Sequence, residues 1–371
     1  MNLPALLGWT FRLALVSALA LLIDSYLPAR EWSWRIQDLI YRRLPQSPPD
    51  TQIVIVDIAQ LERPRLASLL LKLGEAQPSF IGIDAVFQAP FRIQDDSLWQ
   101  AALCTVAQKL PVCLVSTLDL SYPMEQAPQV PISHPLFTGC VEQAFANLIL
   151  YDTTARIVRE YQLYTVSGKD TAFSLGLRAA LAADPALLDT LSFLPSRFHI
   201  RYRGGLSHFY FVSGEEVLQE NIPLGWLRGR ILLLGLADPL YRTMEDIFFS
   251  PLNEAFLRRS FPDMYGVLIH ANVAAMLLHR SFFKEVSLLW VLGLLGTTYL
   301  LISIPGFFLR PGIGRSALVR TLQIGLLWAA IELTIYLGTQ GWWLEVEPVL
   351  WAVLIGGEVD LWRIAPPRPL A

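Results

Sequence analysis

Three aspartates occupy similar places in the sequence, each near the carboxyl end of a strongly apolar run. Asp57 and Asp84 lie within two such runs, and Asp238 comes just after a third one that ends at Leu236. In open parallel sheets, ligands bind at the edge formed by the carboxyl ends of the strands. Three carboxylates on that edge can hold a cation or an amine, or they can cap helix N-termini and serve the fold alone.

Other patterns that could carry chemistry are weaker. The five histidines have no nucleophile-bearing motif beside them, which argues against a Ser-His-Asp or Cys-His arrangement. Cys104, Cys113 and Cys140 lack the spacing of a zinc site. We expect them to be small buried apolar residues, in preference to one disulfide and one free thiol. The pair Gly204 and Gly205 predicts a tight turn.

The composition indicates a membrane protein. Of the 371 residues, 53% are hydrophobic and 16% are charged, which is too apolar for an ordinary soluble enzyme. The 29 basic and 32 acidic residues leave no cationic excess to neutralise phosphates, so we expect no nucleic-acid partner. The lipid bilayer is the first expected partner.

Apolar segments at both ends of the chain predict the membrane contacts. Residues 1–24 form an uncleaved anchor or, in a competing interpretation, a signal peptide with Arg12 in its charged region, and in both cases the region from residue 25 onward is exported. Residues 286–308 carry no charge and predict a transmembrane helix, and residues 321–343 predict a second one. Residues 346–362 predict a third, weaker span or an interfacial helix.

The arginines orient these segments. By the positive-inside rule, the loop and the tail that carry arginines are cytoplasmic. These arginines are Arg310, Arg315 and Arg320 in the loop and Arg363 and Arg368 in the tail. Both termini are then cytoplasmic and residues 25–283 are extracytoplasmic, which predicts a multi-pass protein of the plasma (inner) membrane.

The exported region has the pattern of an α/β domain with a mixed, largely parallel sheet and flanking helices. Near-continuous Val and Ile runs separated by helices are typical of a parallel sheet that is covered on both faces. The expected strands are residues 53–58, 80–87, 112–117, 198–202 and 230–236, and the expected helices are residues 64–73, 97–109, 172–183, 214–220 and 266–279. Residues 146–151 and 158–165 predict an antiparallel hairpin.

Two polar residues lie within apolar helical segments. Glu332 is near the middle of the second predicted span, where a charged side chain costs about 2.5 kcal/mol or more. We expect it to face other helices and to be protonated or bonded to a hydroxyl of Thr297, Thr298 or Tyr299. It would then hold the bundle together or couple the exported domain to the membrane helices. His270 is more often a satisfied packing residue than a ligand.

Short motifs in the exported region occur in a characteristic order. They are Arg35-Ile-Gln-Asp-Leu-Ile-Tyr-Arg-Arg43, Ile55-Val-Asp57, Gly82-Ile-Asp84, Ile200-Arg-Tyr-Arg-Gly-Gly205, Phe211-Val-Ser213, Glu216-Val-Leu218, Leu227-Arg-Gly-Arg-Ile-Leu-Leu-Leu-Gly235, Asp246-Ile-Phe-Phe-Ser-Pro251 and Tyr265-Gly-Val-Leu-Ile-His-Ala271. This set resembles the second type of CHASE domain, a cyclase- and histidine-kinase-associated sensory extracellular domain. The resemblance covers roughly residues 30–283, and the three predicted helices after it are similar to the family's usual membrane module.

The resemblance implies an input domain that binds an unidentified extracellular or periplasmic stimulus and passes the signal through the membrane. In relatives the helices are commonly followed by an effector domain such as a kinase, cyclase or phosphatase, so we expect this chain to act on a separate effector. The family's turn before an arginine usually reads Asp-x-Asp-Gly-x-x-Arg, and here Asp152-Thr-Thr-Ala-Arg156 lacks the second acid and the glycine. Arg156 is a candidate ligand contact or, together with Arg159, a solvated hairpin charge.

The leading hypothesis is a sensory, receptor-like membrane protein without enzymatic activity. Its expected partners are a small-molecule or protein stimulus, a separate effector and, in a homo-oligomer, further copies of the chain. The candidate ligand-binding residues are Asp57, Asp84, Asp238, Asp246 and Arg156, and the candidate intramembrane coupling residue is Glu332. The alternatives are a membrane-tethered metal-dependent hydrolase that uses Asp57 and Asp84 with Asp238 or Asp246, and a structural subunit of a membrane complex. The sequence names no stimulus, cofactor or metal.

Overall fold

The computed structural model divides the chain into two units, each of which is described by itself. The α/β unit is Gln46–Phe282, and the helical unit is Met1–Pro45 together with Phe283–Ala371. The structure describes residues 3–26, 30–45, 47–58, 61–150, 157–190, 194–241, 243–253, 261–310 and 312–361.

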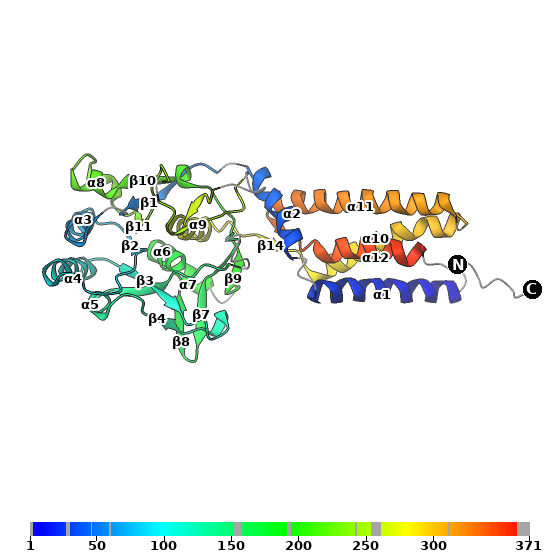
Figure 1. The fold of residues 1–371 in the computed structure, drawn as a ribbon, viewed down its shortest axis with the longest axis horizontal. Coiled ribbons are helices and arrows are strands. Elements are labelled where there is room, and N and C mark those ends of the chain that lie inside the picture. The colour runs from blue at the N-terminus through cyan, green and yellow to red at the C-terminus, as the bar shows by residue number, and fades with distance from the viewer. Residues whose placement is uncertain are drawn as a thin grey trace, which may run out of the picture. The chain divides into compact units, whose positions relative to one another are not determined.

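The α/β unit is built on a seven-stranded sheet in the order β10-β1-β11-β2-β3-β4, with β5 also paired to β3 (Figure 1). Its strands are β1 (Asp50–Asp57), β2 (Phe80–Ile83), β3 (Val112–Leu118), β4 (Gln129–Val130), β5 (Glu142–Phe145), β10 (Phe209–Ser213) and β11 (Ile231–Gly235). Every pairing in the sheet is parallel except that of β3 with β4. The predicted mixed, largely parallel sheet is confirmed.

Helices cover both faces of this sheet (Figure 1). They are α3 (Arg63–Glu75), α4 (Ile93–Ala107), α5 (Pro135–Thr138), α6 (Leu175–Ala183), α7 (Leu187–Thr190), α8 (Gly214–Leu218) and α9 (Gly266–Leu278). In β1, Val54 and Val56 pack in one core with α3 and α4, whereas Ile53 and Ile55 are buried on the opposite face, where α6 and α9 lie. The helix α9 is buried along almost its whole length, as expected for a helix that is apolar on every side.

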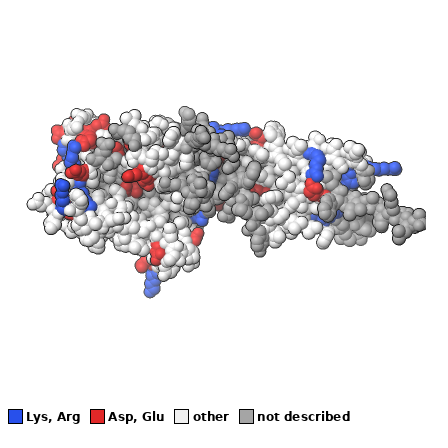
Figure 2. All heavy atoms as spheres, viewed as in Figure 1, with Lys and Arg blue, Asp and Glu red and all other residues white. Residues whose placement is uncertain are grey.

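Charged side chains are distributed unevenly over the surface. Figure 2 shows residues of both signs gathered over the part of the α/β unit that α3, α4 and α8 occupy. Two ion pairs there, Arg65 with Glu215 and Lys72 with Glu220, join α3 to α8 and to the turn after it. Charged side chains of both signs are also visible among the described residues of the helical unit in Figure 2.

The predicted hairpin of residues 146–151 and 158–165 is wrong. The described residues 146–150 form no strand, and β5, which precedes them, pairs in parallel with β3. In the second segment β6 pairs with β9, and β7 pairs with β8. The four strands are β6 (Glu160–Gln162), β7 (Tyr164–Ser167), β8 (Asp170–Phe173) and β9 (Arg197–His199). Residue types indicate where the chain is extended, but the packing of the whole sheet selects the partner of each strand.

The helical unit contains α1 (Leu3–Tyr26), α2 (Arg30–Arg43), α10 (Leu288–Phe308), α11 (Ile313–Thr339) and α12 (Glu347–Leu361). The helices α1, α10, α11 and α12 run side by side (Figure 1). Among the described helices, Leu288–Pro305 and Ile313–Thr339 are long and apolar enough to cross a membrane. The helix α12 has 15 residues and measures about 22 Å, less than the roughly 30 Å of a bilayer core, so its crossing remains a prediction.

Short two-stranded pairings complete both units. In the α/β unit β12 (Ile247–Phe248) pairs with β13 (Met264–Tyr265), and in the helical unit β14 (Lys284–Glu285) pairs with β15 (Trp342–Trp343). The second pair joins the segment before α10 to the turn between α11 and α12.

The helix α11 begins eight residues before the predicted span, at Ile313. Arg315 and Arg320 are therefore in its first turns, and the prediction that both lie in a loop is wrong. Arginine is a good helix former with a long stem, which lets a helix continue beyond the apolar region while the charged group finds a polar partner. Arg320 binds Glu358 of α12 at 2.5 Å.

The cysteines also correct the sequence-based expectation. Cys104 at the end of α4 and Cys140 after α5 form a disulfide, whereas Cys113 in β3 is a free buried thiol. Apolar burial therefore describes Cys113 but not the other two. The bond joins residues 36 apart in the sequence, a pairing that requires α5 to lie beside α4 and that no local pattern indicates.

Loss of the disulfide should destabilise the α/β unit. Closing a loop of this length contributes about 4 kcal/mol in the chain-entropy treatment, so Cys104→Ala/Cys140→Ala should unfold at clearly lower urea concentration than the wild type. The measurement is urea unfolding of the whole protein in detergent, with Cys113→Ala as the matched control. Denatured, unreduced wild type should carry one reactive thiol, and three reactive thiols would contradict the disulfide.

Candidate functional site

The register of the sheet brings the predicted aspartates to one edge. Asp57 in β1 lies beside Gly235 in β11, and Leu234 in β11 lies beside Ile83 in β2. Asp84 comes directly after β2, and its backbone N–H donates to the carbonyl of Leu234 at 2.7 Å. Three adjacent parallel strands thus deliver Asp57, Asp84 and Asp238 to the carboxyl edge, as the sequence predicts.

Two of these carboxylates bind backbone groups. Oδ1 of Asp57 accepts a hydrogen bond from the N–H of Ala237 at 3.1 Å, and Oδ1 of Asp238 accepts one from the N–H of Leu240 at 3.0 Å. Both acceptors shape the loop after β11. The hydrogen bonds of Asp57 and Asp238 thus resemble those of capping residues, except that the donors belong to a loop and not to a helix N-terminus.

Asp84 is in a different environment. Its side chain is 11% exposed, and Oδ2 is buried without a hydrogen-bond partner. Burial raises the pKa of Asp84 well above its ordinary value, and the nearby Asp246 carboxylate raises it further. Nε2 of His270 lies 3.9 Å from Oδ2, too far for a hydrogen bond.

His270 is held from its other side by a tyrosine. Nδ1 of His270 lies 2.6 Å from the hydroxyl of Tyr161, which also accepts the N–H of Gly176 at 3.3 Å. Burial raises the pKa of Tyr161, so its hydroxyl keeps its proton at neutral pH. Burial also lowers the pKa of His270 to about 3, so the imidazole is neutral and one of its two nitrogens carries a proton. His270 is buried and hydrogen-bonded, as expected of a packing residue.

Asp246 reaches this cluster through an unusual backbone. Its φ of +49° lies in the left-handed region, and its carbonyl accepts the N–H of Gly266 at 3.0 Å. A Cβ at Gly266 would lie 2.5 Å from Oδ2 of Asp246, so a larger residue at the start of α9 would displace this carboxylate. Sequence reasoning placed Asp246 only as an optional member of the site, whereas the structure makes it the acidic neighbour of Asp84.

The carboxylates do not converge on a metal position. Within the described part of the chain, no group of three or more His, Cys, Asp or Glu side chains is placed to hold a metal ion. This arrangement gives the hydrolase alternative no support. Arg156 lies outside the described residues, and Arg159 is only 6% exposed, so the interpretation of Arg159 as a solvated charge is wrong.

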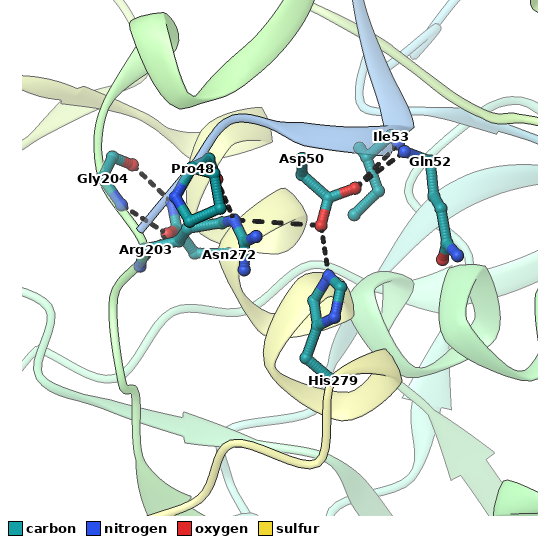
Figure 3. A network of polar contacts seen from close by, with 8 residues as sticks. All are labelled: Pro48, Asp50, Gln52, Ile53, Arg203, Gly204, Asn272 and His279. Atoms are coloured by element: carbon teal, nitrogen blue, oxygen red, sulfur yellow. Dashed lines mark hydrogen bonds and ion pairs between the residues drawn. The ribbon is translucent and has the colours of Figure 1, made fainter. Parts of the chain in front are cut away.

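A second polar network lies at the opposite, amino edge of the sheet (Figure 3). Its centre is Asp50, the first residue of β1, which is 1% exposed. Oδ1 accepts the backbone N–H groups of Gln52 at 2.8 Å and Ile53 at 3.3 Å, and Oδ2 lies 2.6 Å from Nε2 of His279. The guanidinium of Arg203 is 3.9 Å from Oδ2, and its Nε donates to the carbonyl of Pro48 at 3.0 Å.

Asn272 extends this network along α9. Its Oδ1 accepts the N–H groups of Arg203 at 2.7 Å and Gly204 at 3.2 Å, and its Nδ2 donates to the carbonyl of Gly204 at 2.9 Å (Figure 3). The predicted tight turn at Gly204 is thus also hydrogen-bonded to a side chain of α9. Sequence reasoning missed Asp50, Asn272 and His279. Two sequence motifs could have indicated this network, because one includes Arg203 and the other ends beside Asn272.

The candidate coupling residue of the helical unit also has a definite partner. Glu332 on α11 binds Nη1 of Arg43, the last residue of α2, at 2.8 Å, so the expected hydroxyl partners are wrong. A Cβ at Gly338 would lie 2.5 Å from Ile40, which shows how closely α2 packs on α11. The sequence predicted partners only among the spans, and the actual cation comes from an amphipathic helix outside them.

The α/β unit has a sheet with helices on both faces, and the described part of the chain also has two helices long and apolar enough to cross a membrane. The CHASE2 domain family matches residues 13–305, and the chain belongs to this family. CHASE2 is a sensory extracellular domain and not a catalytic one, which fits a sensory role, an extracytoplasmic location and, in general terms, a stimulus and a downstream partner. No curated protein and no solved structure matches the chain.

The buried cluster should give the stability a characteristic pH dependence. Because the pKa of Asp84 is raised on folding, its contribution to stability is lost as the pH rises through the folded-state pKa. Asp84→Asn removes this charge, so we expect the variant to be more stable than the wild type at pH 8 and to lose that advantage at pH 4. Urea unfolding in detergent between these pH values is the measurement, and a less stable variant at pH 8 would contradict the assignment.

The acid side of the same pH–stability profile depends on His270 and provides an internal control for Asp84→Asn. The pKa of His270 is about 3 in the folded protein, below the ordinary value of about 6.5, so the unfolded chain binds the proton more readily between these values. Stability from this residue should fall by at most about 1.4 kcal/mol per pH unit as the pH drops through that window. Asp84→Asn should keep this acid-side loss.

Proposed function

We propose that the chain is a receptor-like sensor whose extracytoplasmic region, residues 25–283, responds to a stimulus and signals through its membrane helices to a separate effector. The observation that carries this proposal is the CHASE2 match, which covers the α/β unit and continues through the first candidate span. A sensory domain joined directly to a membrane helix is the arrangement that transmembrane signalling requires.

The disulfide supports the proposed location. Disulfides persist in oxidising compartments such as the periplasm and the cell exterior, and they are rare in the cytosol. The bond between Cys104 and Cys140 lies within the region that the arginine pattern places outside. Two independent features, one in the α/β unit and one in the loop at Arg310, thus favour the same orientation.

The ion pair of Arg43 and Glu332 supports a route for the signal. Arg43 lies a few residues before the α/β unit in the chain, and Glu332 lies within a helix that is able to span the membrane. A change in the exported domain that displaces α2 would act on this pair. Glu332 is therefore the proposed coupling residue, and Arg43 is its proposed partner.

Ligand contact at the carboxyl edge remains a prediction for Asp57, Asp84, Asp238, Asp246 and Arg156. Of the described members, Asp84 is the one with a buried oxygen that has no hydrogen-bond partner. A ligand that donates a proton or carries a positive charge would satisfy that oxygen.

Thiol labelling tests the topology. In a Cys113→Ala background, Ser207→Cys in intact spheroplasts should react with a membrane-impermeant maleimide, because Ser207 is exposed on the exported domain. Gly314→Cys, exposed at the start of α11, should react only after permeabilisation. The opposite pattern would overturn the orientation and the sensory proposal with it.

Charge reversal tests the signalling route. Glu332→Arg places two cations together and should fail to restore the transcripts altered by deleting the gene in its native host. The exchanged pair Arg43→Glu/Glu332→Arg should restore them, because the attraction is recovered with reversed polarity. Membrane levels of each variant are measured alongside. Equal restoration by Glu332→Arg and the wild type would show that the pair does not carry the signal.

A further inference from the structure

A pocket of about 360 Å³ opens at the amino edge of the sheet, away from the aspartate cluster. Gln52 near the start of β1, Ser79 just before β2 and Ile231 at the start of β11 form one side, and the ends of α6 and α9 form the other. The volume is at the lower end of the range for small-molecule sites, which is about 300 to 1,000 Å³. The pocket therefore suits a small ligand.

Among the described residues of the lining, one side chain carries a negative charge. Asp184, at the end of α6, carries the one carboxylate of the lining, and Oγ of Ser79 is buried without a hydrogen-bond partner. Oδ1 of Asp184 accepts the N–H of Ala186 at 3.2 Å, and Oδ2 is 3.6 Å from the guanidinium of Arg280, which is 61% exposed. Such an exposed pair contributes little, so the Asp184 carboxylate can take a ligand at small cost.

His279 joins the lining of the pocket to the Asp50 network. Its Nε2 donates to the Asp50 carboxylate at 2.6 Å (Figure 3). The other polar side chains of the lining include the Asp184 carboxylate and the amide of Gln52, and Ile231 and Leu278 add apolar surface.

We propose that this pocket binds a small molecule that carries a primary ammonium group. An ammonium has three donors and no acceptor, so the Asp184 carboxylate can both accept its hydrogen bonds and balance its charge. The short carbon chain of such a ligand lies against Ile231 and Leu278. This inference rests on the proposed sensory function and names the chemical class of the stimulus.

The position of the pocket explains how binding reaches the rest of the chain. His279 lines the pocket and also holds Asp50, and the backbone of Gln52 donates to the same carboxylate. Asp50 lies four residues after the α/β unit begins at Gln46, and His279 lies three residues before it ends at Phe282. A ligand that shifts His279 therefore acts on both connections of the unit at once.

Charged thiol reagents test the electrostatic preference of the pocket in the full-length protein. Gln52→Cys is exposed and lines the pocket, and its thiolate displaces methanesulfinate from a methanethiosulfonate to form a mixed disulfide. The two reagents are 2-aminoethyl and 2-sulfonatoethyl methanethiosulfonate. Thr171→Cys, exposed in β8 and paired with Val166 of β7, calibrates their intrinsic rates. Cys113 is buried, with a thiol pKa raised to about 12, and contributes no background reaction.

The expected ratio of cationic to anionic rates is about tenfold higher for Gln52→Cys than for Thr171→Cys, because a carboxylate concentrates cations near it. Adding Asp184→Asn should return the ratio to that of the control. Ala183→Cys, exposed at the end of α6 on the other side of the pocket, replaces Gln52→Cys if that variant misfolds. A ratio equal to the control, or one that Asp184→Asn leaves unchanged, would overturn the proposal.

Competition with 2-aminoethanol is the second measurement. It should slow the labelling of Gln52→Cys, whereas ethylene glycol, which has a similar size and no charge, should not. Protection by both compounds would identify a site for hydroxyls and overturn the ammonium assignment, as would protection by neither. These rates report on the pocket alone, so they can fail while the topology and charge-reversal tests of the sensory role succeed.

Discussion

The buried carboxylate of Asp50 is the constraint around which the amino edge of the α/β unit is organised. Removing an ionised group from water is costly unless hydrogen bonds replace the lost hydration. Here two backbone N–H groups and an imidazole bind the two oxygens, and a guanidinium lies nearby. The imidazole is 229 residues away in the sequence, so the carboxylate can be satisfied only when the first strand and the last helix of the unit are both in place.

Asp84 shows the opposite solution at the other edge of the same sheet. It is buried beside a second carboxylate and a neutral histidine, and one of its oxygens has no partner. Burial raises the pKa of Asp84, whereas hydrogen bonds satisfy both oxygens of the Asp50 carboxylate. At the amino edge the Asp50 carboxylate has its hydrogen bonds. At the carboxyl edge one oxygen of Asp84 has none, and a ligand or a proton can bind it.

The helical unit applies the same chemistry in a less polar setting. Glu332 would be costly alone in an apolar helix, and Arg43 from α2 provides its counter-charge. The side chain of Gln323 bridges to the carbonyls of Val353 and Leu354, and a Cβ at Gly357 would overlap it. Polar contacts between helices therefore fix which helices pack together, a role that uniform apolar surfaces cannot perform.

The sequence by itself determined the parallel sheet, two helices long enough to span a membrane, and the edge at which Asp57, Asp84 and Asp238 meet, because periodicity and strand polarity report local conformation and burial. The tertiary structure alone decided the pairing of Cys104 with Cys140, the partners of β5 and β6, the bond from His279 to Asp50 and the pair of Arg43 with Glu332. Each of these contacts joins residues far apart in the chain. Their side chains meet only through the packing of whole elements, and no local pattern encodes that packing.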